Sequence, residues 1–221
     1  MTTIAPPLSH RARPRTARTR SARTRSASVA LRGAVTIAGV IALTVPAFHT
    51  LRSAPGESGV IAAATAFGTA GLLSLVVAWT IWQLARTRAP IAGVVSGGTL
   101  ALAATTQVYA SLTLLWNGTS SIAWFLDRYA LVLAIGGVHL ACLALTVYLL
   151  DGPTVLMVGL VLTSAAALAA VFPPGWYPQT SDAVISVTLG LLAAGGWMLW
   201  TARRRESLER HRARRPERHP A

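Results

Sequence analysis

The chain has 221 residues, of which 53% are hydrophobic and 12% are charged, with a formal net charge of +13. Soluble domains carry about 25% charged residues, so this composition excludes an ordinary soluble enzyme or binding domain. A membrane span takes about 20 apolar residues, and the length allows several spans but no additional soluble core. With Cys142 as the single cysteine, an intrachain disulfide and a cysteine-based metal cluster are also excluded.

Residues 1–29 form a polar, basic segment in which arginines alternate with Ala, Ser, Thr and Pro. The segment has no apolar face to bury, so we expect a disordered cytoplasmic tail. Its arginines, and those that follow the last span, are expected to contact anionic lipid, at about 1 kcal/mol each near the membrane surface. The predicted lipid-contact residues are Arg11, Arg13, Arg15, Arg18, Arg20, Arg23, Arg25, Arg203, Arg204 and Arg205.

Apolar segments follow the tail in close succession. They cover residues 30–48, 58–84, 91–115, 129–150, 154–172 and 183–201. The fourth and fifth are separated by Asp151, Gly152 and Pro153, where glycine gives a turn its backbone freedom and proline suits the start of a helix. We therefore predict an all-α membrane protein, a six-helix transmembrane bundle over residues 30–201 with short loops. A second disordered, basic cytoplasmic tail is expected over residues 202–221.

The first span has an alternative interpretation as a cleaved signal peptide that ends near Ser53 and Ala54. The long basic region before the span and Arg52 directly before the cleavage site favour a retained helix. Either way, the remaining spans keep their orientation.

The distribution of arginines orients the bundle. With the N-terminus inside, the outer loops keep only Arg52 and Arg128, so 18 of the 20 arginines lie on the inner side. Basic residues near span ends are retained in the cytoplasm. Aromatic residues lie near both ends of the predicted spans, which is typical of the two membrane interfaces. We predict a multi-pass protein of the cell membrane with both termini in the cytoplasm.

The most unusual residue within a span is His139, near mid-depth of the fourth apolar segment. A polar side chain at this depth faces the bundle interior, and Cys142 shares its helix face. Two interpretations remain open: a structural hydrogen bond to a neighbouring helix, or a histidine that binds a ligand, relays a proton or holds a metal. The third span is the expected neighbour, because short connections favour packing of consecutive helices.

Polar residues in the third span are the expected partners of His139. Thr99 and Thr106 lie on a stripe of small residues at three- and four-residue steps, and Gln107 borders that stripe. Such a stripe is either a packing seam or the lining of a cavity. The candidate interior or binding residues are therefore His139, Gln107, Thr106, Thr99 and Cys142.

Two classes of function fit this sequence. The first is a non-catalytic membrane subunit or interaction protein whose bundle packs against other membrane subunits. The second is a small-solute transporter or substrate-capture subunit, with a cavity between the third and fourth helices. The spans contain no Asp or Glu, which argues against a self-contained ion-coupled carrier.

The sequence carries no signature of an enzyme. It has no hydrolase, metalloprotease or phosphate-loop motif, so we predict no catalytic activity, no cofactor and no metal site. Nucleic acid is a disfavoured partner, because the arginine-rich ends contain no interleaved aromatic residues for base stacking.

Reporter fusions test the predicted topology. Fusions at Gly56, Ser120 and Gln179 should report the outer side, and fusions at Arg88 and Gly152 should report the cytoplasm. A reversed signal at any one of these five positions would contradict the six-span arrangement.

Overall fold

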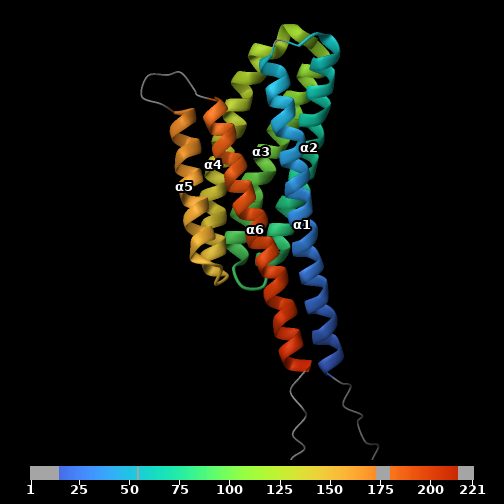
Figure 1. Cartoon of the computed structure of the whole chain (residues 1–221), viewed down its shortest axis with the longest axis vertical. Coiled ribbons are helices and arrows are strands. Elements are labelled where there is room, and N and C mark those ends of the chain that lie inside the picture. The colour runs from blue at the N-terminus through green and yellow to red at the C-terminus, as the bar shows by residue number, and fades with distance from the viewer. Residues whose placement is uncertain (1–14, 54, 173–179, 214–221) are drawn as a thin grey trace, which may run out of the picture.

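The computed structural model describes residues 15–53, 55–172 and 180–213, and these residues are helical apart from short turns. The helices are α1 (Arg15–Arg52), α2 (Glu57–Ala85), α3 (Pro90–Asn117), α4 (Ile122–Leu149), α5 (Thr154–Val171) and α6 (Thr180–Ala213), with a short 3-10 helix η1 (Gly118–Ser121) between α3 and α4. Each helix packs against its neighbours in sequence, and α1 also packs against α6, beside which it lies in Figure 1. Because α4 also contacts α6, helices α1, α2, α3, α4 and α6 form a ring, with α5 outside it.

The helix ends follow from local chemistry. Pro90 is the first residue of α3. Proline is favourable there because an N–H at this position would have no helical acceptor. Gly118 ends the same helix with a positive φ of 61°, a conformation that glycine adopts without strain. Between α4 and α5 it is Asp151, not Gly152, that takes the left-handed conformation, with φ 53°. Gly152 is required there for space, because a Cβ would lie 2.9 Å from the Val147 carbonyl oxygen.

The helices have the length and apolarity of membrane spans. By these criteria five continuous segments qualify, and one of them, Pro90–Leu149, contains both α3 and α4, between which the chain reverses at η1. Large apolar side chains point outward along the helices, for example Ile91 and Val155, which are 80% and 81% exposed. A surface of this kind is unfavourable in water and suits a lipid environment.

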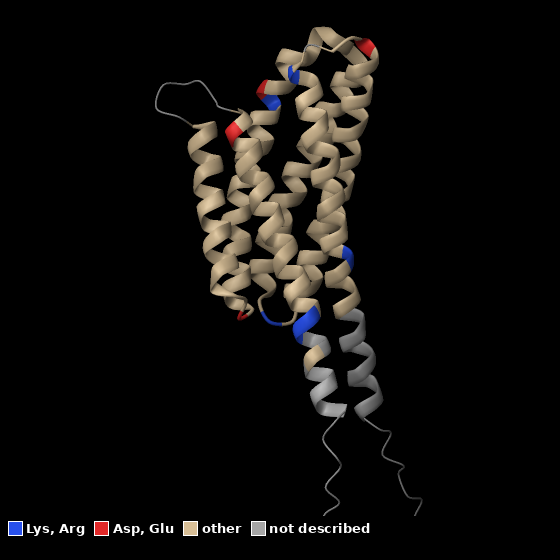
Figure 2. Cartoon of the chain, in the orientation of Figure 1, with Lys and Arg blue, Asp and Glu red and all other residues tan. Residues whose placement is uncertain are grey.

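Charged residues mark the two ends of the bundle (Figure 2). Near the helix ends, four arginines lie over an aromatic ring one helical turn earlier, with guanidinium-to-ring distances of 4.9–5.9 Å. The pairs are Arg52 with Phe48, Arg86 with Trp82, Arg128 with Trp124 and Arg204 with Trp200. Arg and Trp are the residues that anchor helix ends at a membrane interface, so these pairs delimit the apolar slab.

Three helices extend beyond their expected bounds. Residues 1–29 and 202–221 are expected to be disordered, but the described part of both segments is helical. Helix α1 begins at Arg15, and α6 continues to Ala213. Ala and Arg have high helix propensity, and lengthening an existing helix avoids the cost of nucleation. Residues 1–14, with Arg11 and Arg13, and residues 214–221 lie outside the described residues. Helix α4 starts at Ile122 and not near 129, so Arg128 belongs to the helix.

Close contact between α2 and α3 depends on glycine. A Cβ at Gly97 would lie 3.0 Å from the carbonyl oxygen of Ala78, and one at Gly93 would lie 2.6 Å from the Cβ of Ala85. The next residue, Gly98, has no neighbouring atom within 4 Å of such a Cβ. The Gly93–Gly97 pair is therefore a packing contact between two helix backbones.

Gly97→Ala should lower the thermal unfolding temperature, because overpacking against a backbone oxygen costs about 1–3 kcal/mol. Gly98→Ala is the matched control and should leave that temperature unchanged or raise it, since alanine favours a helix by up to about 1 kcal/mol over glycine. Equal responses of the two variants, measured on the purified protein in lipid nanodiscs, would contradict the packing described here.

Candidate functional site

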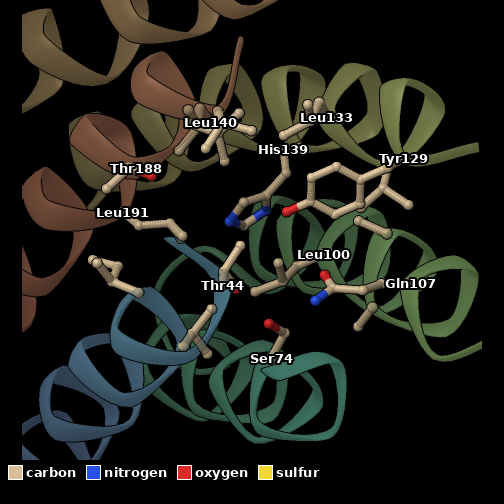
Figure 3. Close-up of a pocket in the computed structure, with 18 residues that line it drawn as sticks. Thr44, Ser74, Leu100, Gln107, Tyr129, Leu133, His139, Leu140, Thr188 and Leu191 are labelled. Carbon is tan, nitrogen blue, oxygen red and sulfur yellow. The ribbon is translucent and has the colours of Figure 1, made fainter. Parts of the chain in front are cut away.

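A cavity of about 60 Å³ lies within the ring, lined by residues of α1, α2, α3, α4 and α6 (Figure 3). A buried water needs roughly 10–15 Å³ of such space, so the cavity has room for several waters or for part of a small solute. None of the lining residues is charged, and most are aliphatic or small. The polar residues of the lining are Thr44, Ser74, Gln107, Tyr129, His139 and Thr188.

His139 reaches the cavity from α4 and is only 1% exposed. Its Nδ1 lies 2.8 Å from the carbonyl oxygen of Ser96 on α3, which is the kind of third-helix partner that the sequence predicts. The Thr99 hydroxyl is also within 3.5 Å of Nδ1, but it is closer to the Val95 and Ser96 carbonyl oxygens, at 3.0 Å each. The ring is thus held in place by the α3 backbone.

This hydrogen bond fixes the tautomer of the neutral ring. A carbonyl oxygen can only accept, so Nδ1 carries the proton and donates it to Ser96. The other nitrogen, Nε2, is then an acceptor with a free lone pair. Nε2 is buried and has no hydrogen-bond partner among the described residues. An unsatisfied buried acceptor costs about 1–3 kcal/mol, so a feature of this kind needs a physical reason.

A second polar group of the lining is also without a partner in the described chain. The Thr44 hydroxyl, on α1, is buried and makes no hydrogen bond there. The Ser96 hydroxyl shares this property, but Ser96 is not part of the lining. Two unsatisfied groups, Thr44 Oγ1 from α1 and His139 Nε2 from α4, therefore belong to the lining of one small cavity.

Gln107 and Tyr129 are the other large polar residues of the lining. The Gln107 side-chain amide donates to the Phe67 carbonyl oxygen at 2.9 Å, which ties α3 to α2. Tyr129 packs in an aromatic cluster, with ring centroids 4.9 Å from Phe67 and 5.6 Å from Phe125. Its hydroxyl points into the space beside His139 (Figure 3).

The sequence-predicted candidates divide into two groups. His139 and Gln107 line the cavity, whereas Thr99, Thr106 and Cys142 do not. Thr106 donates to Leu102 within its own helix, and Cys142 is half-buried as a free thiol. The cavity is also not confined to the space between α3 and α4, because these helices pack directly together and α1 and α6 complete the lining.

Sequence reasoning missed Thr44, Tyr129 and Thr188. Tyr129 lies near the outer end of the fourth apolar segment, where aromatic residues are expected to face the membrane interface, yet it is only 2% exposed. Thr44 is a lone hydroxyl in an apolar stretch, and its position two residues before Pro46 was the available signal. Nothing in the local pattern of α6 distinguishes Thr188 from a residue that bonds its own helix.

Comparisons with protein-family models, with curated proteins and with solved structures find no match to this chain. Within the described residues, no group of three or more His, Cys, Asp or Glu side chains is placed to hold a metal ion. The site must therefore be interpreted from its own geometry.

Nitrogen NMR on isotope-labelled histidine tests the tautomer. His139 should have a protonated Nδ1 and a bare Nε2, because Nδ1 donates to the Ser96 carbonyl oxygen at 2.8 Å. The assigned signal should disappear in His139→Leu and persist in His49→Leu, whose histidine lies exposed near the end of α1. A protonated Nε2 in the neutral ring would contradict the geometry of the site.

Proposed function

We propose that this chain is a six-span protein of the cell membrane that binds a small neutral molecule in its central cavity and catalyses no reaction of its own. In this role it is a capture or carrier subunit. The observation that carries the proposal is the buried, unpartnered Nε2 of His139 at the wall of that cavity.

Charge supports six spans with both termini in the cytoplasm. At the end where α1 starts and α6 finishes, the described charged side chains are mainly basic, and at the opposite end they are mainly acidic (Figures 1 and 2). The first group comprises Arg32, Arg86, Arg88, Asp151, Arg203 and Arg204, and the second comprises Arg52, Glu57, Asp127, Arg128 and Asp182. Excess arginine on one side favours that side as the cytoplasmic one, where Arg203 and Arg204 would meet anionic lipid.

Energetics favour binding over a purely structural histidine. The bond from His139 to Ser96 contributes about 0.5–1.5 kcal/mol, whereas the unsatisfied Nε2 costs about 1–3 kcal/mol. A side chain retained only for stability would leave no such deficit, since an apolar residue of similar size would pack there at no loss. A ligand that donates a hydrogen bond to Nε2 removes the deficit.

The lining supports binding without catalysis. It contains no carboxylate, thiol, arginine or lysine that could act beside His139 as a nucleophile or a second acid–base group. The Nδ1 proton is already committed to a backbone carbonyl oxygen. A histidine held in this way can accept a hydrogen bond at Nε2, and Tyr129 is the one other titratable side chain among the lining residues.

A second proposal, an interaction subunit that packs with partner helices, is supported by α5. This helix lies at the edge of the bundle, and its buried residues are only Leu160, Ser164 and Ala167. Its remaining surface is available either to lipid or to a helix of another membrane subunit. The two roles are compatible, because α5 does not line the cavity.

His139→Leu, measured without added ligand, tests the binding role. Its free energy of unfolding should stay within about 1 kcal/mol of the wild type or rise, since one bond is lost and one unsatisfied acceptor is removed. The control Ser164→Ala loses a satisfied bond to the Gly137 carbonyl oxygen, 2.7 Å long, and should be destabilised. If His139→Leu is the more strongly destabilised of the two, His139 is structural and the proposal fails.

A further inference from the structure

The cavity is closed along the bundle axis. Toward the end where α1 starts, it is followed by a packed cluster that includes Leu143, Trp197 and Met198, each at most 1% exposed. Toward the opposite end lie the aromatic rings of Phe67 and Phe125, both 0% exposed. A solute from the water on either side would have to displace one of these clusters.

The cavity is least deeply buried on the side formed by α1 and α6. All lining residues that come from α2, α3 and α4 are buried, whereas every half-buried lining residue belongs to α1 or α6. These half-buried residues are Ile41, Thr44, Val187, Thr188 and Leu191. The floor is therefore formed by α3 and α4, and the rim by α1 and α6.

The rim lies at the depth of lipid chains. Thr44 is eight residues from Arg52 at the end of α1, and Thr188 is eight residues from Thr180 at the start of α6. At about 1.5 Å per residue, both are roughly 12 Å from the helix ends, well inside an apolar core about 30 Å thick. The neighbours Val45 and Leu189 are 41% and 52% exposed, so the rim is bordered by apolar surface.

From this geometry we infer that the ligand is a neutral, membrane-dissolved amphiphile with a hydroxyl head, such as a long-chain alcohol, which enters from the bilayer between α1 and α6. The inference rests on the proposed function, and it names the ligand class and the route. The alcohol O–H donates to His139 Nε2, and the alcohol oxygen accepts from the Thr44 hydroxyl. One head group thus satisfies both unpartnered groups of the cavity.

Other head groups fit less well. A carboxylate, an ester or a ketone has no proton to give to Nε2, and an ammonium group would be buried without a counter-charge. The cavity volume of about 60 Å³ is space for several waters, at roughly 10–15 Å³ each, and not for a long alkyl chain. Only the hydroxyl and its first carbons can enter, so the rest of the chain remains at the rim, against the apolar surface of α1 and α6.

The α1 helix has a weak point next to the rim. Pro46 has no N–H, so the carbonyl group of Ala42 loses its helical bond two residues before Thr44. Helices bend readily at such positions. A bend at Pro46 allows the α1 side of the rim to yield when an alkyl chain lies against it.

The experiment uses the full chain in nanodiscs of phosphatidylcholine and phosphatidylglycerol, with the nitrogen NMR signal of His139 Nε2 as the readout. The probes are 1-hexadecanol, its methyl ether, which has no hydroxyl proton, and glycerol as a water-soluble alcohol. Hexadecanol should shift the Nε2 signal in a saturable way, and the other two probes should not. An ether that acts as well as the alcohol overturns the hydrogen-bond assignment.

Variants separate the route from the site. Thr188→Trp fills the rim and should weaken the hexadecanol response at least about tenfold, whereas Leu189→Trp, on the lipid-facing side of the same helix, should respond like the wild type. Thr44→Val keeps the side-chain shape, removes the hydroxyl and should weaken binding about threefold to tenfold, since one hydrogen bond is lost. This conservative variant serves as the test if the tryptophan variant does not fold.

The outcomes distinguish the two proposals. If glycerol shifts the signal and hexadecanol does not, lateral entry is wrong and a small-solute site remains. If Thr188→Trp folds and binds hexadecanol like the wild type, the route between α1 and α6 is wrong. If no probe shifts the signal at saturation, both the ligand class and the binding role of His139 fall.

Discussion

Lipid offers no hydrogen-bond partners, so a bundle of apolar helices has to satisfy its polar side chains within the chain. Most hydroxyls here do so locally, as Thr65 and Thr105 do by donating to the carbonyl oxygen four residues earlier. Among the described residues, the shorter side-chain bonds that cross between helices have a backbone carbonyl oxygen as their acceptor. The acceptors of His139, Gln107 and Ser164 lie on α3, α2 and α4. These bonds make α2, α3, α4 and α5 one hydrogen-bonded unit. Helices α1 and α6 complete the ring around the cavity, to whose lining they contribute apolar residues such as Val40 and Val184.

That division explains which side of the cavity is less deeply buried. The side that is tied by polar bonds is tightly closed, and glycines such as Gly97 bring its backbones to within about a van der Waals contact. The side formed by α1 and α6 carries the half-buried residues of the rim and the helix-weakening Pro46. Thr44 and His139 therefore face each other across the boundary between a rigid part of the bundle and a more yielding part, which suits a site that a membrane-dissolved molecule enters sideways.

Much of the fold and part of the site could be predicted from the sequence, for physical reasons that also explain the failures. Apolar runs and their arginine-rich ends identify the helices, and mid-depth placement identifies His139 and its α3 partner. The early start of α4 was missed because Asp127 and Arg128 resemble a loop, although Arg128 can remain helical by lying over Trp124, 5.4 Å from the ring. The part of the cavity lining that comes from α1 and α6 could not be predicted, because it depends on a long-range contact between these helices that leaves no signal in the periodicity of either one.

The same packing argues for capture over passage. A channel or a carrier for polar solutes needs a polar path that continues to both membrane surfaces. Here the polar groups that line the cavity lie between the buried ring of Trp197 at one end and that of Phe125 at the other. A molecule whose head is held by His139 and Thr44 and whose chain remains in the bilayer needs no such path, since it can leave by the route through which it came. A site of this kind would retain its ligand within the plane of the membrane, as the proposed capture role requires.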